Sequence, residues 1–186
     1  MEYIIFDLEA TCWGKKNREM KEIIEIGAVK LNGNLEVLDI FSQFVKPTIN
    51  STLSTFCKSL TGIIQKDVDD APIFDKAIRN FEEWIFSSDR EIKLISWGYY
   101  DKKQTLIESG VKGYSGKIIE LLEKNHISLK HEFAKMRKER TCGMKQALSK
   151  LKIPLKGSHH RGIDDANNIT QIFIAVFPKL KAKGVL

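Results

Sequence analysis

The feature that most constrains this chain is an apolar strand near the N-terminus that carries two carboxylates. The run YIIFDLEAT places Asp7 and Glu9 two positions apart. Because side chains alternate across a strand, these carboxylates share one face, roughly 6–7 Å apart, whereas Ile4, Phe6 and Leu8 point to the other face. Such a pair repels itself unless a positive charge lies between its members, and a hard divalent cation is the usual partner. A strand that runs out into solvent is the alternative explanation.

Length and composition predict a single domain over residues 1–186. The chain has 186 residues, of which 42% are hydrophobic, and this is enough to bury a substantial core. Its formal net charge is +6. A basic protein favours a polyanionic partner, although many basic proteins have none.

The cysteines and the N-terminus indicate a soluble protein of a reducing compartment. Cys12, Cys57 and Cys142 form neither a zinc-binding pattern nor a disulfide framework. The first residues lack the basic segment and the longer apolar run of a signal peptide, and no apolar stretch reaches the length of a membrane span. We therefore expect a cytoplasmic protein that does not associate with membranes. The sequence carries little information on oligomeric state, and a monomer is the default expectation.

Periodicity and turn residues predict an α/β fold, with a mixed sheet covered by helices. The sequence NGN at residues 32–34 predicts a hairpin turn, the polar segment 12–21 a loop, and Pro178 the end of the last helix. The predicted strands cover residues 3–11, 22–31, 35–45, 92–97 and 127–129. The predicted helices cover residues 51–60, 71–85, 102–111, 117–124, 132–139, 141–151 and 164–177.

Two further aspartates stand where they could join the first pair. Asp101 lies in a predicted loop at the end of a strand, which is where α/β proteins bind ligands, although it could be an ordinary loop residue. Asp165 lies in register with the apolar stripe of the last helix, where an unpaired charge would be costly. That stripe consists of Ile169, Ile172, Phe173 and Val176. A satisfied aspartate at a helix start explains Asp165 equally well.

The neighbours of Asp165 include one more aspartate and two histidines. Asp164 lines up with Asn168 and Gln171, which predicts a solvent-facing side of the helix. His159 and His160 lie in a glycine-flanked loop, where a histidine near a metal could activate a water. Two surface histidines without a role are the alternative, and composition does not choose between them.

Together these motifs resemble those of the DEDDh exonucleases, which are 3′→5′ exonucleases of the ribonuclease H-like fold. The matching elements are the run FDLEAT at residues 6–11, the aspartate after Ser96-Trp97-Gly98, and His160 five residues before Asp165. Further stretches resemble the Eri-type RNA exonucleases and the KapD-like inhibitors of the KinA sporulation pathway. They are residues 22–29, 53–57, 60–63 and 162–166. The resemblance covers nearly the whole chain and implies a mixed five-stranded sheet flanked by helices.

The resemblance also implies a reaction and the residues that perform it. Asp7, Glu9, Asp101 and Asp165 match the four acids that bind two Mg²⁺ or Mn²⁺ ions in the family. His160 matches the general base, and this match alone favours it over His159. The implied activity is hydrolysis of RNA or single-stranded DNA from the 3′ end to nucleoside 5′-monophosphates.

Candidate contacts to the nucleic acid follow from the same resemblance. They are Glu9, Ala10, Thr11, Trp13, Leu60, Ile63 and His160. Phe56 is a further candidate, but ordinary core packing is the expectation for Phe56 and Leu60, and Trp13 could equally cap the fold. Nine basic residues between Lys130 and Lys156 could form a phosphate track, although such a run is usually a solvated face.

Two other functions remain open at this point. One is an oligoribonuclease-like activity confined to very short RNAs. The other is regulation of a protein partner in a kinase signalling pathway through an exonuclease fold, and the intact acids argue against it because a pure binder need not keep them.

Overall fold

A five-stranded mixed sheet forms the centre of the protein in the computed structural model, as predicted. Its strands are β1 (Glu2–Ala10), β2 (Ile23–Leu31), β3 (Val37–Phe44), β4 (Ile92–Ser96) and β5 (His126–Ser128). The spatial order is β3-β2-β1-β4-β5. Strand β1 pairs antiparallel with β2 and parallel with β4, so the strand that carries Asp7 and Glu9 lies in the middle of the sheet.

The structure describes residues 1–15 and 19–186. The predicted loop over residues 12–21 includes residues 16–18, which lie outside the described part of the chain. Its described residues form neither helix nor strand, in agreement with the prediction.

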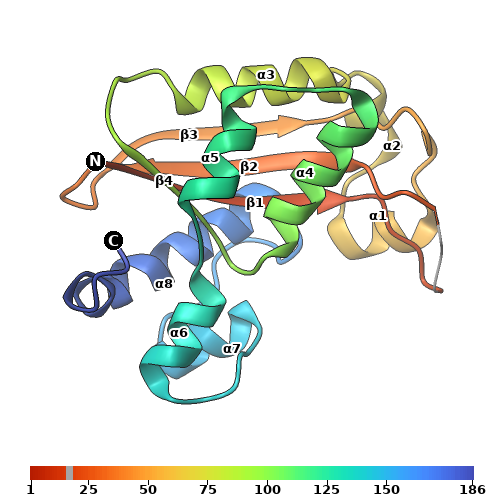
Figure 1. The fold of residues 1–186 in the computed structure, drawn as a ribbon. Coiled ribbons are helices and arrows are strands. Elements are labelled where there is room, and N and C mark those ends of the chain that lie inside the picture. The colour runs from red at the N-terminus through yellow and green to blue at the C-terminus, as the bar shows by residue number, and fades with distance from the viewer. Residues whose placement is uncertain (16–18) are drawn as a thin grey trace.

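Helices cover both faces of the sheet. They are α1 (Thr55–Thr61), α2 (Gln65–Asp69), α3 (Phe74–Ile85), α4 (Tyr100–Lys112), α5 (Lys117–Asn125), α6 (Leu129–Arg137), α7 (Met144–Leu151) and α8 (Gly162–Ala182). Figure 1 shows α3, α4 and α5 on one side of the sheet and the long α8 on the other, with α6 and α7 beside it. The short α2 was not predicted.

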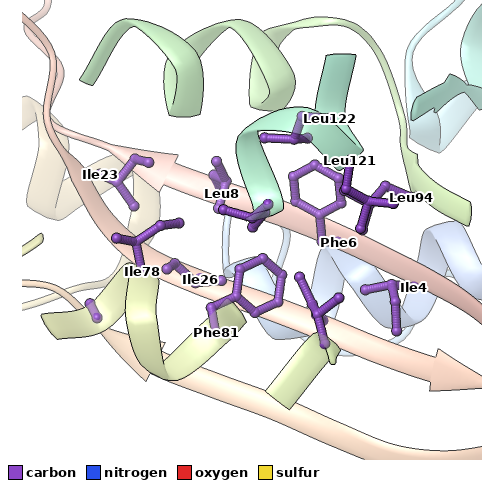
Figure 2. Packing of buried hydrophobic residues seen from close by; sticks show 14 of the residues in the cluster. Ile4, Phe6, Leu8, Ile23, Ile26, Ile78, Phe81, Leu94, Leu121 and Leu122 are labelled. Carbon is purple, nitrogen blue, oxygen red and sulfur yellow. The ribbon is translucent and has the colours of Figure 1, made fainter. Parts of the chain in front are cut away.

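Strand β1 separates two hydrophobic cores, as its alternating side chains predict. Ile4, Phe6 and Leu8 pack with residues of α3 and α5, and Figure 2 shows this cluster. The rings of Phe6 and Phe81 lie 6.2 Å apart between centroids. On the opposite face, Tyr3 and Ile5 pack against α8. Asp7 and Glu9 continue this second face, so they point toward the start of α8.

Several predicted helix boundaries differ from the structure, and three of these differences need an explanation. Asp101 lies in the first turn of α4 rather than in a loop, because this helix already begins at Tyr100. Helix α7 is capped by Gly143 rather than by Thr141. Helix α8 continues through Pro178, although proline removes one backbone donor. The carbonyl left without a partner belongs to Ile174, which is exposed to water, and the last turn is retained because Leu180 is buried in the core.

The start of α8 lies directly against β2 at a pair of glycines. A Cβ atom on Gly27 would lie 2.1 Å from the carbonyl carbon of Gly162, a separation that no side chain permits. Gly27 also pairs with Asp7 across the β1–β2 ladder. The absence of a side chain at residue 27 therefore allows α8 to begin beside the first acid.

We predict that Gly27→Ala destabilises the fold by about 3 kcal/mol or more, because the new methyl group forces α8 away from β2. Gly110→Ala is the matched control, since Gly110 is an exposed residue of α4 with no atom within 4 Å of its added Cβ. This control should be neutral or should stabilise the fold by up to about 1 kcal/mol. Urea unfolding of both variants tests the prediction, and equal stabilities would contradict it.

Candidate active site

Four acids from three separate elements meet at the end of β1. Asp7 and Glu9 come from β1, Asp101 from the first turn of α4, and Asp165 from the first turn of α8. Carboxylate oxygens of Asp7, Glu9 and Asp165 lie within 4.8 Å of one another. Asp101 is joined to β1 by its Oδ1 atom, which accepts a hydrogen bond of 3.2 Å from the backbone N–H of Leu8. The structure thus brings together all four acids that the sequence singled out.

Glu25 binds the start of α8 and so helps to place Asp165 beside the acids of β1. This buried residue of β2 stands directly opposite Glu9 in the ladder. It accepts hydrogen bonds from the backbone N–H of Gly162, at 2.9 Å, and from the guanidinium of Arg161, at 3.3 Å. A carboxylate at a helix N-terminus satisfies a free backbone donor and is favoured by the helix dipole. Glu25 was not predicted as a site residue, although a carboxylate within a mostly apolar strand was a usable signal.

Both loop histidines lie beside Asp165. The Nδ1 atom of His159 lies 2.9 Å from Oδ2 of Asp165, and the backbone N–H of His160 donates to the same oxygen at 3.0 Å. The two imidazole rings stack with centroids 3.9 Å apart, and both line the same cavity as the acids. Burial, followed by the neighbouring His159, lowers the pKa of His160 below its ordinary value. Its imidazole is therefore neutral at neutral pH and can accept a proton.

The helix face predicted to meet solvent instead anchors the histidine loop. Asn168 is fully buried, and its amide side chain exchanges hydrogen bonds of 3.0 and 2.8 Å with the backbone N–H and C=O of Lys156. Asp164 accepts a 2.8 Å hydrogen bond from the backbone N–H of Ser158. The prediction of a solvent face was wrong because these polar side chains bind the backbone of the preceding loop.

Burial and mutual repulsion raise the pKa values of three of the acids. Desolvation, followed by repulsion from Asp101, raises the pKa of Asp7 well above its ordinary value. Burial raises the pKa of Glu9 to about 8, and Asp165 is the neighbouring charge that adds most to this shift. Burial also raises the pKa of Asp101 to about 6, although the hydrogen bond from Leu8 opposes the shift.

This donor set fits a divalent cation. Its ligand atoms are clustered carboxylate oxygens, which hard cations such as Mg²⁺ prefer. The only basic side chain among the main influences on the pKa of Glu9 is Arg161, and that guanidinium is already bound by Glu25. A bound cation would relieve the remaining repulsion among the acids.

The acids and histidines line a cavity of about 620 Å³. Of the predicted nucleic-acid contacts, Glu9, Ala10, Leu60 and His160 line this cavity. Thr11 does not, since it is buried and its hydroxyl accepts a hydrogen bond from the backbone N–H of Glu22. Trp13 is half-buried and also lies outside the cavity lining.

The structure reverses the expected roles of the apolar residues around α1. Ile63 is fully buried in a small core with Ile24 and Cys57, so its side chain offers no surface to a base. Phe56 and Leu60, which were expected in the core, are 45% and 38% exposed. They stand four residues apart on one side of α1, whereas Cys57 faces the core, and periodicity alone did not distinguish the two sides of so short a helix.

Comparison with known proteins identifies the family of this chain. A sequence model described as "Exonuclease" (RNase_T) matches residues 4–173. The chain is 33% identical over 183 residues to 3′-5′ exoribonuclease 1 of Rattus norvegicus and 33% identical over 180 residues to ERI1 exoribonuclease 3 of Homo sapiens. These alignments cover 93% and 91% of this chain and 52% of each relative, so the chain spans about half the length of the curated relatives it matches.

A solved nuclease domain shares the fold over most of its length. The nuclease domain of 3′hExo, a DEDDh family member bound to rAMP, superimposes with a TM-score of 0.86 and 29% sequence identity. The match covers 96% of this chain and 92% of that one. The five-stranded sheet with flanking helices is therefore the ribonuclease H-like exonuclease fold. In the described part of the chain, no helix combines the length and apolar character needed to cross a membrane.

The raised pKa values predict a stability that depends on both pH and Mg²⁺. A carboxyl whose pKa rises on folding stabilises the fold at low pH, and this contribution is lost as pH rises. For Glu9 the loss falls between its ordinary value of 4.5 and about 8. Mg²⁺ binds the ionised carboxylates, so it should raise Tm more at pH 8 than at pH 6, by about 5–10 °C when it is saturating.

Thermal melting of wild type, Asp7→Asn and Asp75→Asn with and without Mg²⁺ measures this effect. Asp7→Asn should reduce the Mg²⁺-dependent rise in Tm. Asp75→Asn should retain it, because Asp75 is an exposed residue of α3 paired with Arg79. An equal rise in all three proteins would show that Mg²⁺ acts elsewhere.

Proposed function

Since the chain belongs to the exonuclease family, we propose that it is a metal-dependent 3′→5′ exonuclease that degrades single-stranded RNA. The observation that carries this proposal is the convergence of Asp7, Glu9, Asp101 and Asp165 beside the imidazole of His160. These residues come from distant parts of the chain, and the fold places them around one cavity that is large enough for a nucleotide.

The four acids would hold two Mg²⁺ or Mn²⁺ ions. When bound, such a pair stabilises the attacking and leaving oxygens at a phosphodiester and lowers the pKa of a water. The mutual repulsion of the acids contributes to the raised pKa values of Asp7 and Glu9, and it supports this role because a cation would relieve it.

His160 would act as the general base. Its neutral imidazole accepts a proton from the attacking water, while its backbone N–H keeps the adjacent loop bound to Asp165. Water attacks the phosphorus, and the bond from phosphorus to the 3′ oxygen of the preceding nucleotide breaks. The released product is a nucleoside 5′-monophosphate.

RNA is the substrate that we favour. The relatives are named exoribonucleases, and the similar nuclease domain is bound to rAMP. In this chain the terminal nucleotide would lie near the backbone of Ala10, with its base against the exposed apolar side chains of Leu60 and Phe56. Thr11 and Trp13 would contribute through the backbone conformation of their segment rather than through side chains in the cavity.

The basic residues between Lys130 and Lys156, of which Lys130 lines the cavity, support binding of a polyanion. Eight of the nine basic residues between Lys130 and Lys156 are exposed. Lys135, Arg137 and Lys150 pair with glutamates, whereas the structure shows no ion pair for the other described members of the run. The others are Lys130, Lys138, Arg140, Lys145, Lys152 and Lys156. We propose that these cations contact RNA phosphates, so binding should weaken as salt rises.

The cysteines bear on the compartment in which the protein acts. Three free cysteines suit the reducing cytoplasm, where we propose that the protein acts as a monomer. The intact acids favour an enzyme over a protein that only regulates a signalling partner.

Digestion of matched 5′-labelled RNA and DNA oligonucleotides tests the proposal. Wild type with Mg²⁺ should shorten the RNA one nucleotide at a time from the 3′ end, and chelation of the metal or Asp7→Asn should stop it. Adding a dinucleotide substrate distinguishes a general exonuclease from an oligoribonuclease-like enzyme. Internal cleavage, or shortening that persists in Asp7→Asn, would refute the assignment.

A matched pair of substitutions separates the two histidines. His160 has a backbone φ of 67°, a left-handed conformation that asparagine tolerates, so asparagine is the suitable replacement at both positions. His160→Asn should lower kcat by about 10²–10⁴-fold, the usual contribution of a general base. His159→Asn should cost much less, since His159 contacts Asp165 and the ring of His160 but is not the proposed base. The reverse order would assign the base to His159.

A further inference from the structure

The cavity extends beyond the acids to a wall with aromatic side chains, and no part of the proposed mechanism uses this wall. Its lining on this side includes Tyr99, Lys130 and His131.

Tyr99 and His131 form a supported aromatic pair. Their ring centroids lie 4.7 Å apart, with the ring planes inclined by 32°. The Nδ1 atom of His131 lies 2.6 Å from the hydroxyl of Ser128, which is itself buried. The backbone of Tyr99 is fixed because its C=O accepts a 3.0 Å hydrogen bond from Lys103 at the start of α4. Tyr99 is nevertheless 45% exposed, although its ring also lies 5.9 Å from the ring of His126, so part of its aromatic surface remains accessible.

Lys130 adds a cation beside this pair. Its backbone N–H donates a 2.7 Å hydrogen bond to the carbonyl of Trp97, which fixes α6 against the turn after β4. Its side chain passes over Gly98, where an added Cβ would lie 4.0 Å from Cδ of Lys130. An open aromatic surface with an adjacent ammonium group is the combination that binds a nucleobase and its phosphate.

The sheet order places this wall across the acids from the apolar surface of α1. Helix α1 packs on the side of β2, where Cys57 contacts Ile24. Tyr99 follows β4, and His131 follows β5. Because β1 lies between β2 and β4, Asp7 and Glu9 separate the two surfaces. A strand whose terminal base lies near Leu60 and whose scissile phosphate lies at the acids would continue toward Tyr99.

We propose that Tyr99 and His131 bind the base of the nucleotide on the 5′ side of the scissile phosphate, and that Lys130 contacts the adjoining phosphate. This subsite rests on the proposed exonuclease function and defines its substrate as a strand of at least two nucleotides. Stacking does not depend on base identity, so the subsite would require a base without selecting among the four.

A cycle that combines a protein variant with a modified substrate tests the subsite. The substrates are a short RNA and the same RNA lacking the base of its penultimate nucleotide, and kcat/KM is measured for removal of the terminal nucleotide only. Base removal should lower kcat/KM for wild type about tenfold, within the range expected for one stacked base. For Tyr99→Ala the intact RNA should already be cleaved about tenfold more slowly, with little further loss on base removal. Tyr99→Phe should behave as wild type, because it keeps the ring.

The remaining outcomes separate the two proposals. An equal effect of base removal on wild type and Tyr99→Ala would overturn the subsite, while cleavage of the intact RNA would leave the exonuclease assignment standing. An RNA lacking a base four nucleotides from its 3′ end is the control and should show no dependence on Tyr99. If wild type with Mg²⁺ cleaves none of these RNAs, the proposed function itself fails.

Discussion

The close contact between the start of α8 and β2 is the constraint on which the site depends. Gly27 and Gly162 allow the two backbones to meet, and the carboxylate of Glu25 binds the free N–H of Gly162 at the end of the helix. This seating directs Asp165 toward Asp7 and Glu9 on the central strand. The histidine loop is then held from the same helix turn, by Asp164, Asp165 and Asn168. Catalytic geometry and fold stability therefore share the same few contacts.

The fold places like charges together where water cannot fully screen them. The raised pKa values of Asp7, Glu9 and Asp101 express this unfavourable arrangement before a cation binds. The two hydrophobic cores on either side of β1 supply the stability that makes it tolerable. A protein built in this way gains from binding a divalent ion, because the ion removes a repulsion that the scaffold maintains.

The sequence predicted the inward position of Asp165 well but misjudged its surroundings. Asp165 lies in register with a long apolar stripe, and a helix of this length has only one way to bury such a stripe. The same periodicity wrongly predicted that Asp164 and Asn168 face solvent. In sequence, a polar side chain that hydrogen-bonds a neighbouring loop cannot be distinguished from one that faces water. Phe56 and Leu60 were wrongly expected in the core for a similar reason, since α1 has only two turns and carries too few residues for periodicity to identify its buried side.

By itself, the sequence determined the order of the strands and of all the helices except α2, and the two faces of β1, because these follow from local periodicity. The set of four acids came from the resemblance of its motifs to a known family. Only the tertiary structure decided which groups support the acids and which surfaces remain open. Glu25, Gly27 and the Tyr99–His131 pair acquire their roles through contacts between segments far apart in the chain. Such contacts depend on how the helices pack on the sheet, and local sequence patterns do not specify that packing.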